Sequence, residues 1–175
     1  CILLHAGVYN LSSGLNLNKS NLTISGNNGE EVILSGIVKI PTSSWSIYRD
    51  LGGGNVIYKA TVPLSLPAVI VNSAWAPTAH FPSEGWLAVP SDISNSLSAS
   101  TWTDSNLIGL TDVNRATVMG FSYSGMFTGK YAVASFDSST GAVLTASNTA
   151  MVAGADRYVL SNVLGAITQG QWAES

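Results

Sequence analysis

Tryptophans in loop-like segments are the residues of this chain best suited to bind a ligand. Trp75, Trp86 and Trp102 lie in or beside stretches that lack the alternation of a strand. Sugars bind by laying their apolar C–H faces on aromatic rings, while polar side chains fix their hydroxyl groups. The sequence therefore predicts sugar contact here, and the residues expected to make it are Trp75, His80, Glu84, Trp86, Trp102 and Asp104.

A structural role for the same tryptophans is the competing interpretation. Large aromatic side chains contribute more to cores than any other residues. The three tryptophans would then close the end of a β-barrel or cap its junction with another domain. From the sequence alone we favour this role, and we keep sugar contact as the functional hypothesis.

The carboxylates do not form a recognisable catalytic pair. A glycosidase needs two carboxylates facing one another across the scissile bond. Glu30 and Glu31 are adjacent, so on a strand they would point to opposite faces. Acids in Ser/Thr-rich turns usually form Asx-turns or caps, which is our interpretation of Asp92, Asp104, Asp112 and Asp137. We therefore expect no catalytic residue in this segment.

The sequence offers no pattern for a metal or a cofactor. Cys1 is the single cysteine, which excludes an internal disulfide framework. With His5 and His80 it does not make the three or four ligands of a zinc site. The nucleophile elbow, the P-loop and the dinucleotide-binding motif are all missing, and the glycines at 52–54 are not followed by a predicted helix. We expect neither a metal nor a cofactor.

Composition excludes several classes of protein. Only 10% of the residues are charged, while Ser, Thr and Asn together supply 51 of 175. These three residues are poor in helix interiors, so a coiled coil or helical bundle is disfavoured. No apolar run reaches the roughly 18 residues of a membrane-spanning helix. A net charge of −3 with seven Lys and Arg argues against a nucleic-acid partner.

The first forty residues predict a β-solenoid. Short apolar runs at 2–4, 8–11, 15–17, 22–24, 32–34 and 37–40 are separated by Gly, Asn and Ser. Apolar residues alternate within 15–24, which is typical of a strand with one buried face. Strands this short cannot form long hairpins, but they can stack as rungs, each burying its inward side chains against the next.

The opening segment resembles the first rungs of right-handed parallel β-helix proteins, a broad class of polysaccharide lyases and glycosidases. The resemblance covers about the first fifth of the chain, through a rung of the form I-x-L-x-x-G-x-Y and two that follow it. The matching residues are Ile2, Leu4, Gly7, Tyr9, Leu15, Leu17, Leu22, Ile24, Gly26, Val32, Leu34 and Gly36. It implies the fold of this part and says little about activity.

After residue 45 the pattern changes to that of antiparallel strands. The glycines at 52–54 predict a turn before a strand at 56–62, and a further strand is expected at 68–72. The clearest hairpin is Tyr131–Phe136, a turn at 137–141, and Ala142–Ala146. Both alternating sets of its first strand contain apolar residues, so the buried face is not assigned. The Ser/Asn/Asp-rich stretch 91–106 predicts a surface loop, and 162–167 a single helical turn.

This second part resembles the antiparallel β-domain that interrupts the helix in some β-helix glycoside hydrolases. The last block matches at Tyr158, Leu160, Asn162, Leu164 and Trp172, whereas His80, Gln171 and Ala173 differ from the usual family residues. The resemblance implies an all-β chain with three parts. These are β-helix coils at 1–44, an inserted antiparallel β-barrel or sandwich at 45–157, and a return segment at 158–175.

The same resemblance implies that the chain is a fragment from the N-terminal part of a larger carbohydrate-active protein. We expect a polysaccharide-degrading glycoside hydrolase in which this segment shapes the substrate cleft. The alternative is a non-catalytic β-helix adhesin or a glycan-binding or structural module. Expected partners are a polysaccharide or oligosaccharide, together with the remainder of the β-helix or a second copy of the chain. The Ser/Thr/Asn-rich composition is typical of secreted proteins, so we expect an extracellular or periplasmic location.

Overall fold

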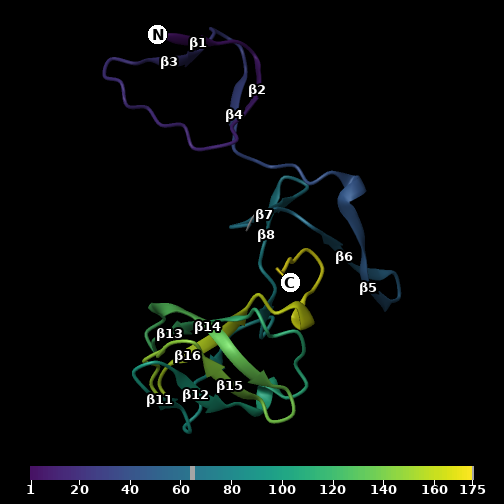
Figure 1. Cartoon of the computed structure of the whole chain (residues 1–175), viewed down its shortest axis with the longest axis vertical. Helices are drawn as coiled ribbons and strands as arrows, with labels where there is room; N and C mark the ends of the chain where they lie inside the picture. Colours follow the sequence, from purple (N-terminus) through teal and green to yellow (C-terminus); the bar gives the residue numbers. More distant parts are fainter. Residues whose placement is uncertain (64–65, 175) are drawn as a thin grey trace. The chain divides into compact units, whose positions relative to one another are not determined.

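The chain is all-β and divides into two compact units, Cys1–Ser65 and Leu66–Ser175. The computed structural model describes residues 1–63 and 66–174 (Figure 1). Strands are the main regular structure of this described part, and its helical segments are single 3-10 turns, η1 (Thr42–Ser44), η2 (Ser105–Leu107) and η3 (Leu164–Ala166). The all-β expectation is confirmed, as is the helical turn within 162–167. None of the helices in the described residues is long and apolar enough to span a bilayer.

Two parallel strand pairs form the start of the first unit. Strand β1 (Ile2–Leu4) pairs with β3 (Ile24–Gly26), and β2 (Gly7–Asn10) pairs with β4 (Val32–Ser35). Partner residues are thus 22 positions apart in the first pair and 25 in the second. The apolar runs 15–17 and 37–40 are not strands, although both were expected to be. A strand needs a hydrogen-bonded neighbour, and these runs join no ladder within the described residues.

The carboxylate of Glu30 joins one parallel segment to the next. It accepts hydrogen bonds from the backbone N–H of Ala6 (2.6 Å) and from Asn27 Nδ2, and it lies 3.2 Å from His5 Nδ1. The Asn27 amide, followed by the Ala6 N–H, lowers the pKa of the Glu30 carboxyl group. Glu30 is therefore more than the solvated turn residue that the sequence indicates, because it bridges residues 24 apart.

A hairpin completes the first unit. Strands β5 (Trp45–Gly52) and β6 (Asn55–Ala60) pair antiparallel around the Gly53-Gly54 turn. Both glycines have positive φ, which few other residues adopt at low cost. The predicted turn is therefore confirmed, and the following strand ends at Ala60, before the predicted end at 62.

The first unit lacks a core of its own. None of its described residues is buried. Apolar side chains that would face a core remain exposed, among them Ile2, Val8, Leu34 and Val38 at 46%, 59%, 47% and 63%. Burial of apolar surface is the main force that holds a fold together. This unit therefore contributes little stability by itself and has apolar surface to offer a partner.

The second unit is built on one antiparallel sheet, with strand order β10-β16-β13-β14-β15-β12-β11 and β9 also pairing with β16 (Figure 1). The small hairpin β7 (Val69–Val71) and β8 (Ala74–Ala76) precedes it. The sheet strands are β9 (His80–Phe81), β10 (Leu87–Ala88), β11 (Ser94–Asn95), β12 (Ser100–Thr103), β13 (Thr117–Phe121), β14 (Phe127–Asp137), β15 (Ala142–Thr145) and β16 (Arg157–Ser161).

The expected barrel does not close. The terminal strands β10 and β11 of the sheet do not pair with each other, so the sheet stays open. Each of these two strands is only two residues long. Such short edges offer too few backbone donors and acceptors to complete a barrel.

The predicted hairpin is confirmed as β14 and β15, joined by the turn at 138–141. A bulge interrupts the ladder between Val133 and Ser135. Because of the extra residue, Val133 and Phe136 both pack in the core although they have opposite parity in the sequence. The bulge explains why alternation alone could not assign the buried face of this strand.

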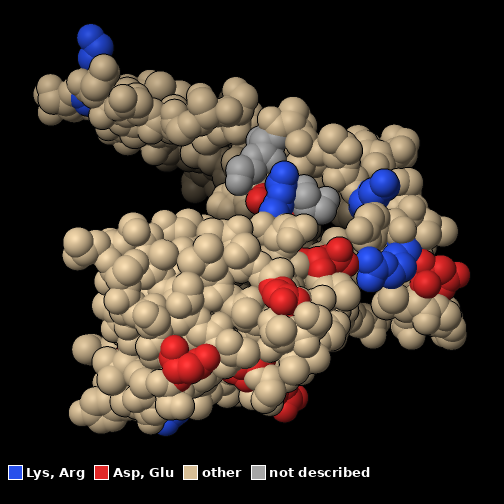
Figure 2. All heavy atoms as spheres, turned by 60° about the horizontal axis from the view of Figure 1, so that its bottom comes forward, with Lys and Arg blue, Asp and Glu red and all other residues tan. Residues whose placement is uncertain are grey.

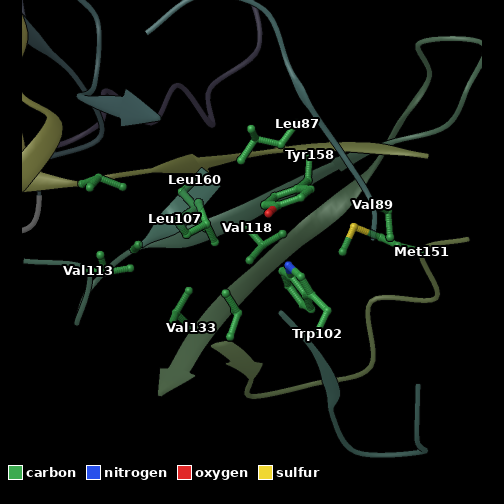
Figure 3. Close-up of a cluster of buried hydrophobic side chains, with 13 residues drawn as sticks. Leu87, Val89, Trp102, Leu107, Val113, Val118, Val133, Met151, Tyr158 and Leu160 are labelled. Atoms are coloured by element: carbon green, nitrogen blue, oxygen red, sulfur yellow. The ribbon is translucent and has the colours of Figure 1, made fainter. Parts of the chain in front are cut away.

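One cluster of buried side chains forms the core of the second unit (Figure 3). Tyr158 and Leu160 from β16, Val118 from β13 and Leu107 from η2 are fully buried in it. The remaining buried apolar members are Leu87, Val89, Trp102, Val113, Ala116, Val133, Val143, Met151 and Val163. This cluster fixes which side chains of the sheet point outward.

The first half of the segment 91–106 is largely exposed, as expected for a surface loop, whereas buried residues occur in the second half. The segment contains β11, β12 and η2, and Ser100, Trp102 and Asp104 within it are buried. Polar side chains can be buried when hydrogen bonds satisfy them. Ser100 achieves this by donating its backbone N–H to Thr145 Oγ1 (3.0 Å) and by accepting the Thr149 N–H on its hydroxyl (2.9 Å). Composition misses such a strand because its polar groups pair internally.

The contrast between the units predicts different hydrogen-exchange rates. In hydrogen–deuterium exchange read by mass spectrometry, amides of β1–β4 should exchange more than about a hundredfold faster than those of β13 and β16, because opening costs little where no core must be broken. Raising the protein concentration should slow exchange in β1–β4 if copies cover their apolar surface. Equal protection of the two units in dilute solution would contradict this account of the first unit.

Candidate functional site

Alternation along the two central strands creates an open outer face. On β13, Val118 and Gly120 are buried, so Met119 and Phe121 point to the other side. On β16, Tyr158 and Leu160 belong to the core cluster. Val159 is only 8% exposed, but it lies on the same outer side as Met119 because the two residues pair directly. We call the surface formed by Met119, Phe121 and Val159, together with the flanking residues described below, the open face.

Gly120 lets the core pack close to the backbone beneath the open face. A Cβ atom at this position would lie 2.6 Å from Thr128 Oγ1 and 3.3 Å from Met151 Sδ. A larger residue would therefore displace the side chains that support the strand. The outward direction of Met119 and Phe121 on β13 depends on this tight packing on the inner side.

A shallow hollow of about 380 Å³ lies on the open face. Its apolar part consists of Met119, Phe121, Val159 and Trp86. The other lining residues are Thr78, His80, Gly85 and Ser161. Apolar surface beside a few polar groups is the usual composition of a ligand site. No carboxylate lines this hollow in the described part of the chain.

Three aromatic rings follow one another along this face. The Trp86 ring meets Phe121 edge to face with centroids 4.3 Å apart, and Phe121 meets Phe127 in the same manner at 5.5 Å. Trp86 is 50% exposed and Phe127 is 51% exposed. A half-exposed indole held by another ring keeps an apolar surface available in a fixed orientation. Such surfaces suit the C–H face of a sugar.

Polar groups border the aromatic row. His80 pairs with Ser161, so both side chains lie on the open face. The His80 Nδ1 donates to the carbonyl oxygen of Thr78 at 3.1 Å. This contact assigns the proton of the neutral ring to Nδ1 and leaves Nε2 as an acceptor. Hydroxyl donors and acceptors of a sugar could therefore pair with His80 Nε2, Ser161 and Thr78.

The other expected sugar-contact residues occupy different environments. Trp75 is 73% exposed on β8 and does not line the hollow. Glu84 is exposed in the loop before Trp86, where Gly85 rather than Glu84 lines the hollow. Of the three tryptophans, the structure therefore places only Trp86 at the open face.

Trp102 and Asp104 lie in the core, which differs from the predicted sugar contact. Trp102 is 3% exposed and Asp104 is 5% exposed. The strand β12 that carries Trp102 is part of the sheet, so its alternation directs the indole inward, against Tyr158, with ring centroids 5.5 Å apart. The structural interpretation holds for Trp102, and we do not include these two residues in the candidate site.

Asp104 is a buried carboxylate in which both oxygens accept hydrogen bonds. Its Oδ2 accepts the Tyr158 hydroxyl proton at 2.7 Å, and its Oδ1 accepts the backbone N–H and the side-chain amide of Asn106, both at 2.8 Å. It thereby caps η2, the cap role that the sequence indicates. Asp104 also ties this turn to the central strand β16.

The environment of Tyr158 is strongly perturbed. Burial first, and then the hydrogen bond to Asp104, raise the pKa of the Tyr158 hydroxyl well above its usual range. The Trp102 indole opposes this rise in pKa, although its Nε1 forms no hydrogen bond of good geometry with any described residue. Figure 3 shows the indole nitrogen on the side of Trp102 that faces Tyr158. Tyr158 therefore stays protonated and serves as a structural donor.

A second hollow of about 400 Å³ contains two carboxylates, Asp92 and Asp137, beside Thr101, Thr103 and Ser135. Asp92 Oδ2 accepts the Thr103 N–H at 3.0 Å, and Asp137 Oδ1 accepts the N–H and hydroxyl of Ser139 at 2.8 and 2.7 Å. The Ser139 hydroxyl and N–H lower the pKa of Asp137. A glycosidase acid needs a raised pKa instead. Asp137 thus caps its turn, as the sequence indicates, whereas Asp92 bonds to strand β12, eleven residues further along the chain.

Sequence reasoning missed the sheet residues of the open face, namely Met119, Phe121, Val159 and Ser161. Their signal was present, because two apolar sets alternate along β13 and along β16. One set belongs to the core and the other to the surface. Without knowing that the two strands pair, neither set can be assigned to the outside.

Comparisons with known proteins identify no relative of this chain. No protein-family model, no curated protein and no solved structure matches the chain. In the described part of the chain, no three His, Cys, Asp or Glu residues are grouped so as to hold a metal ion. The functional argument therefore depends on the open face itself.

The Asp104–Tyr158 bond predicts a stability effect that separates core residues from the open face. Tyr158→Phe should lower the free energy of unfolding by about 1–3 kcal/mol, because a buried carboxylate loses one of its donors. Tyr123→Phe removes a hydroxyl from a side chain that is 74% exposed and should have no measurable effect. Urea unfolding followed by tryptophan fluorescence measures both variants. Equal stability of the two would contradict the structural role given to Tyr158.

Proposed function

We propose that the second unit binds saccharides on its open face, with Trp86 and Phe121 as the stacking surface. The observation that carries the proposal is the half-exposed Trp86 ring, which Phe121 holds at 4.3 Å beside the polar groups of His80 and Ser161. A sugar ring offers matching surfaces, apolar on its C–H faces and polar at its rim. The hollow is shallow and open, which suits a unit within a longer polysaccharide chain.

The first unit bears on the kind of protein to which this face belongs. Parallel pairs between residues 22 and 25 apart are the geometry of stacked rungs. We propose that they are the first coils of a right-handed parallel β-helix in a polysaccharide-degrading glycoside hydrolase that acts outside the cell or in the periplasm. Further rungs or a second copy of the chain would cover the exposed apolar residues. The second unit would then shape the substrate cleft.

A non-catalytic adhesin or glycan-binding module is the second candidate. It is favoured by the lining of the hollow, which contains aromatic, hydroxyl and imidazole groups and no carboxylate. Binding by stacking alone needs no acid, whereas hydrolysis needs two carboxylates at the scissile bond. Release of reducing ends from a bound polysaccharide by the full-length protein distinguishes the enzyme from the adhesin.

Removing the Trp86 ring should weaken saccharide binding without unfolding the protein. Trp86→Ala should lower the affinity for the tightest-binding member of a plant and algal oligosaccharide panel about tenfold, the loss expected for one stacking contact. Trp75→Ala is the matched control, because it removes an exposed indole that does not line the hollow. Isothermal titration calorimetry gives the affinities, and circular dichroism verifies the fold.

Two results would contradict the proposed function. In the first, no member of the panel binds the unsubstituted protein. In the second, Trp75→Ala weakens binding as much as Trp86→Ala, which would move the contact from the sheet to the β7–β8 hairpin.

A further inference from the structure

The second unit carries few cationic side chains, and two of them lie on the open face. Its three cations are Arg115, Lys130 and Arg157, against seven acids. Lys130 pairs with Met119, and Arg157 pairs with Phe121. Directly opposed side chains of antiparallel strands lie on the same face. The two cations therefore flank the apolar strip of β13 on opposite sides, about 10 Å apart across the strands and about 7 Å apart along them.

Both cations are available to a ligand. Lys130 and Arg157 are exposed, and neither forms an ion pair within the part of the chain that the structure describes. Asp156 precedes Arg157 but turns inward. It is 7% exposed, and its Oδ2 accepts the N–H of Val152 at 3.0 Å. The adjacent acid thus leaves the guanidinium group of Arg157 unpaired.

No acid of the described residues lines the hollow of the open face. Strands β9, β10, β13 and β16 contain none. Asp92 and Asp137 line the other hollow, and Glu84 lies in the loop beside Trp86 without lining the hollow there. Figure 2 shows that uncharged residues make up most of the surface in view, with charged side chains at a few places. On so sparsely charged a surface, two unpaired cations set the sign of the local potential.

We infer that the open face selects an acidic polysaccharide whose sugar units carry carboxylate groups. The inference depends on the proposed function and adds to it the class of ligand. Trp86 and Phe121 stack on the sugar rings, while Arg157 and Lys130 pair with carboxylates on either side of the strip. The planar fork of an arginine can bind both oxygens of a carboxylate in a bidentate geometry.

Two ligands that differ only in their carboxyl groups distinguish the contribution of stacking to binding from that of charge. The probes are an oligogalacturonate and the same oligosaccharide after reduction of its carboxyl groups, each titrated into the unsubstituted protein and its variants. The unsubstituted protein should bind the acidic form about tenfold more tightly than the neutral form, because charge-assisted hydrogen bonds are roughly twice as strong as neutral ones. Salt near 0.5 M should reduce this preference by screening the exposed charges.

The variants assign the preference to named side chains. The double variant Lys130→Gln, Arg157→Gln should bind both forms equally, with unchanged affinity for the neutral form. Arg115→Gln is the matched control, because Arg115 lies in the turn before β13, at the end opposite to Phe121, and it should keep the preference. Trp86→Ala should weaken the binding of both forms alike and leave the ratio of the two affinities unchanged.

The outcomes separate the two proposals. Equal binding of the acidic and neutral forms by the unsubstituted protein overturns the inference and leaves the proposed function standing. Binding of neither form by the unsubstituted protein overturns the inference, whereas the proposed function is overturned only if no member of the oligosaccharide panel binds. Tighter binding of a sulfated oligosaccharide than of the uronate also overturns the inference. So does comparable binding of a single-stranded oligonucleotide, which would show a general attraction for polyanions.

Discussion

The register between β13 and β16 determines both sides of the sheet in the second unit. Val118 pairs with Leu160 inside, while Met119 pairs with Val159 outside. A slip of one residue would exchange these sets and bring Met119, Val159 and their neighbours into the core. The core prevents such a slip, because Tyr158 and Leu160 are fully buried and Gly120 leaves room only for the packing observed. The open face is thus a consequence of how the core is filled.

Polar contacts within the core hold the rest of the sheet to this central pair. Asp104 accepts the Tyr158 hydroxyl and caps η2, so the turn after β12 is tied to β16. Gly141, with positive φ, lies so close to Asp104 that a side chain there would overlap its carbonyl oxygen. The β14–β15 hairpin turn is thereby packed on the same residue. In the first unit, the carboxylate of Glu30 also bridges distant residues, but it acts at an exposed site.

Sequence reasoning succeeded where local signals and structure coincide. The β14–β15 hairpin and the Gly53-Gly54 turn were predictable because their turn residues favour these geometries. It failed at 100–104, where hydrogen bonds of Ser100 with Thr145 and Thr149 allow a Ser/Thr strand to be buried. Trp86 was identified by its residue type and loop-like context. Its partner Phe121 was not, because only strand pairing between distant segments decides which of two apolar sets faces outward.

The most direct test of the saccharide face is a two-dimensional NMR titration of the ¹⁵N-labelled protein, observed at the indole N–H signals of its five tryptophans. An oligosaccharide that binds the open face should shift the signal of Trp86 and leave those of Trp75, on the separate β7–β8 hairpin, and Trp102, in the core, unchanged. Saturable shifts confined to Trp86 are the result that this account predicts. Shifts at Trp75 without Trp86, or no shift at any indole while the ligand binds, would contradict it.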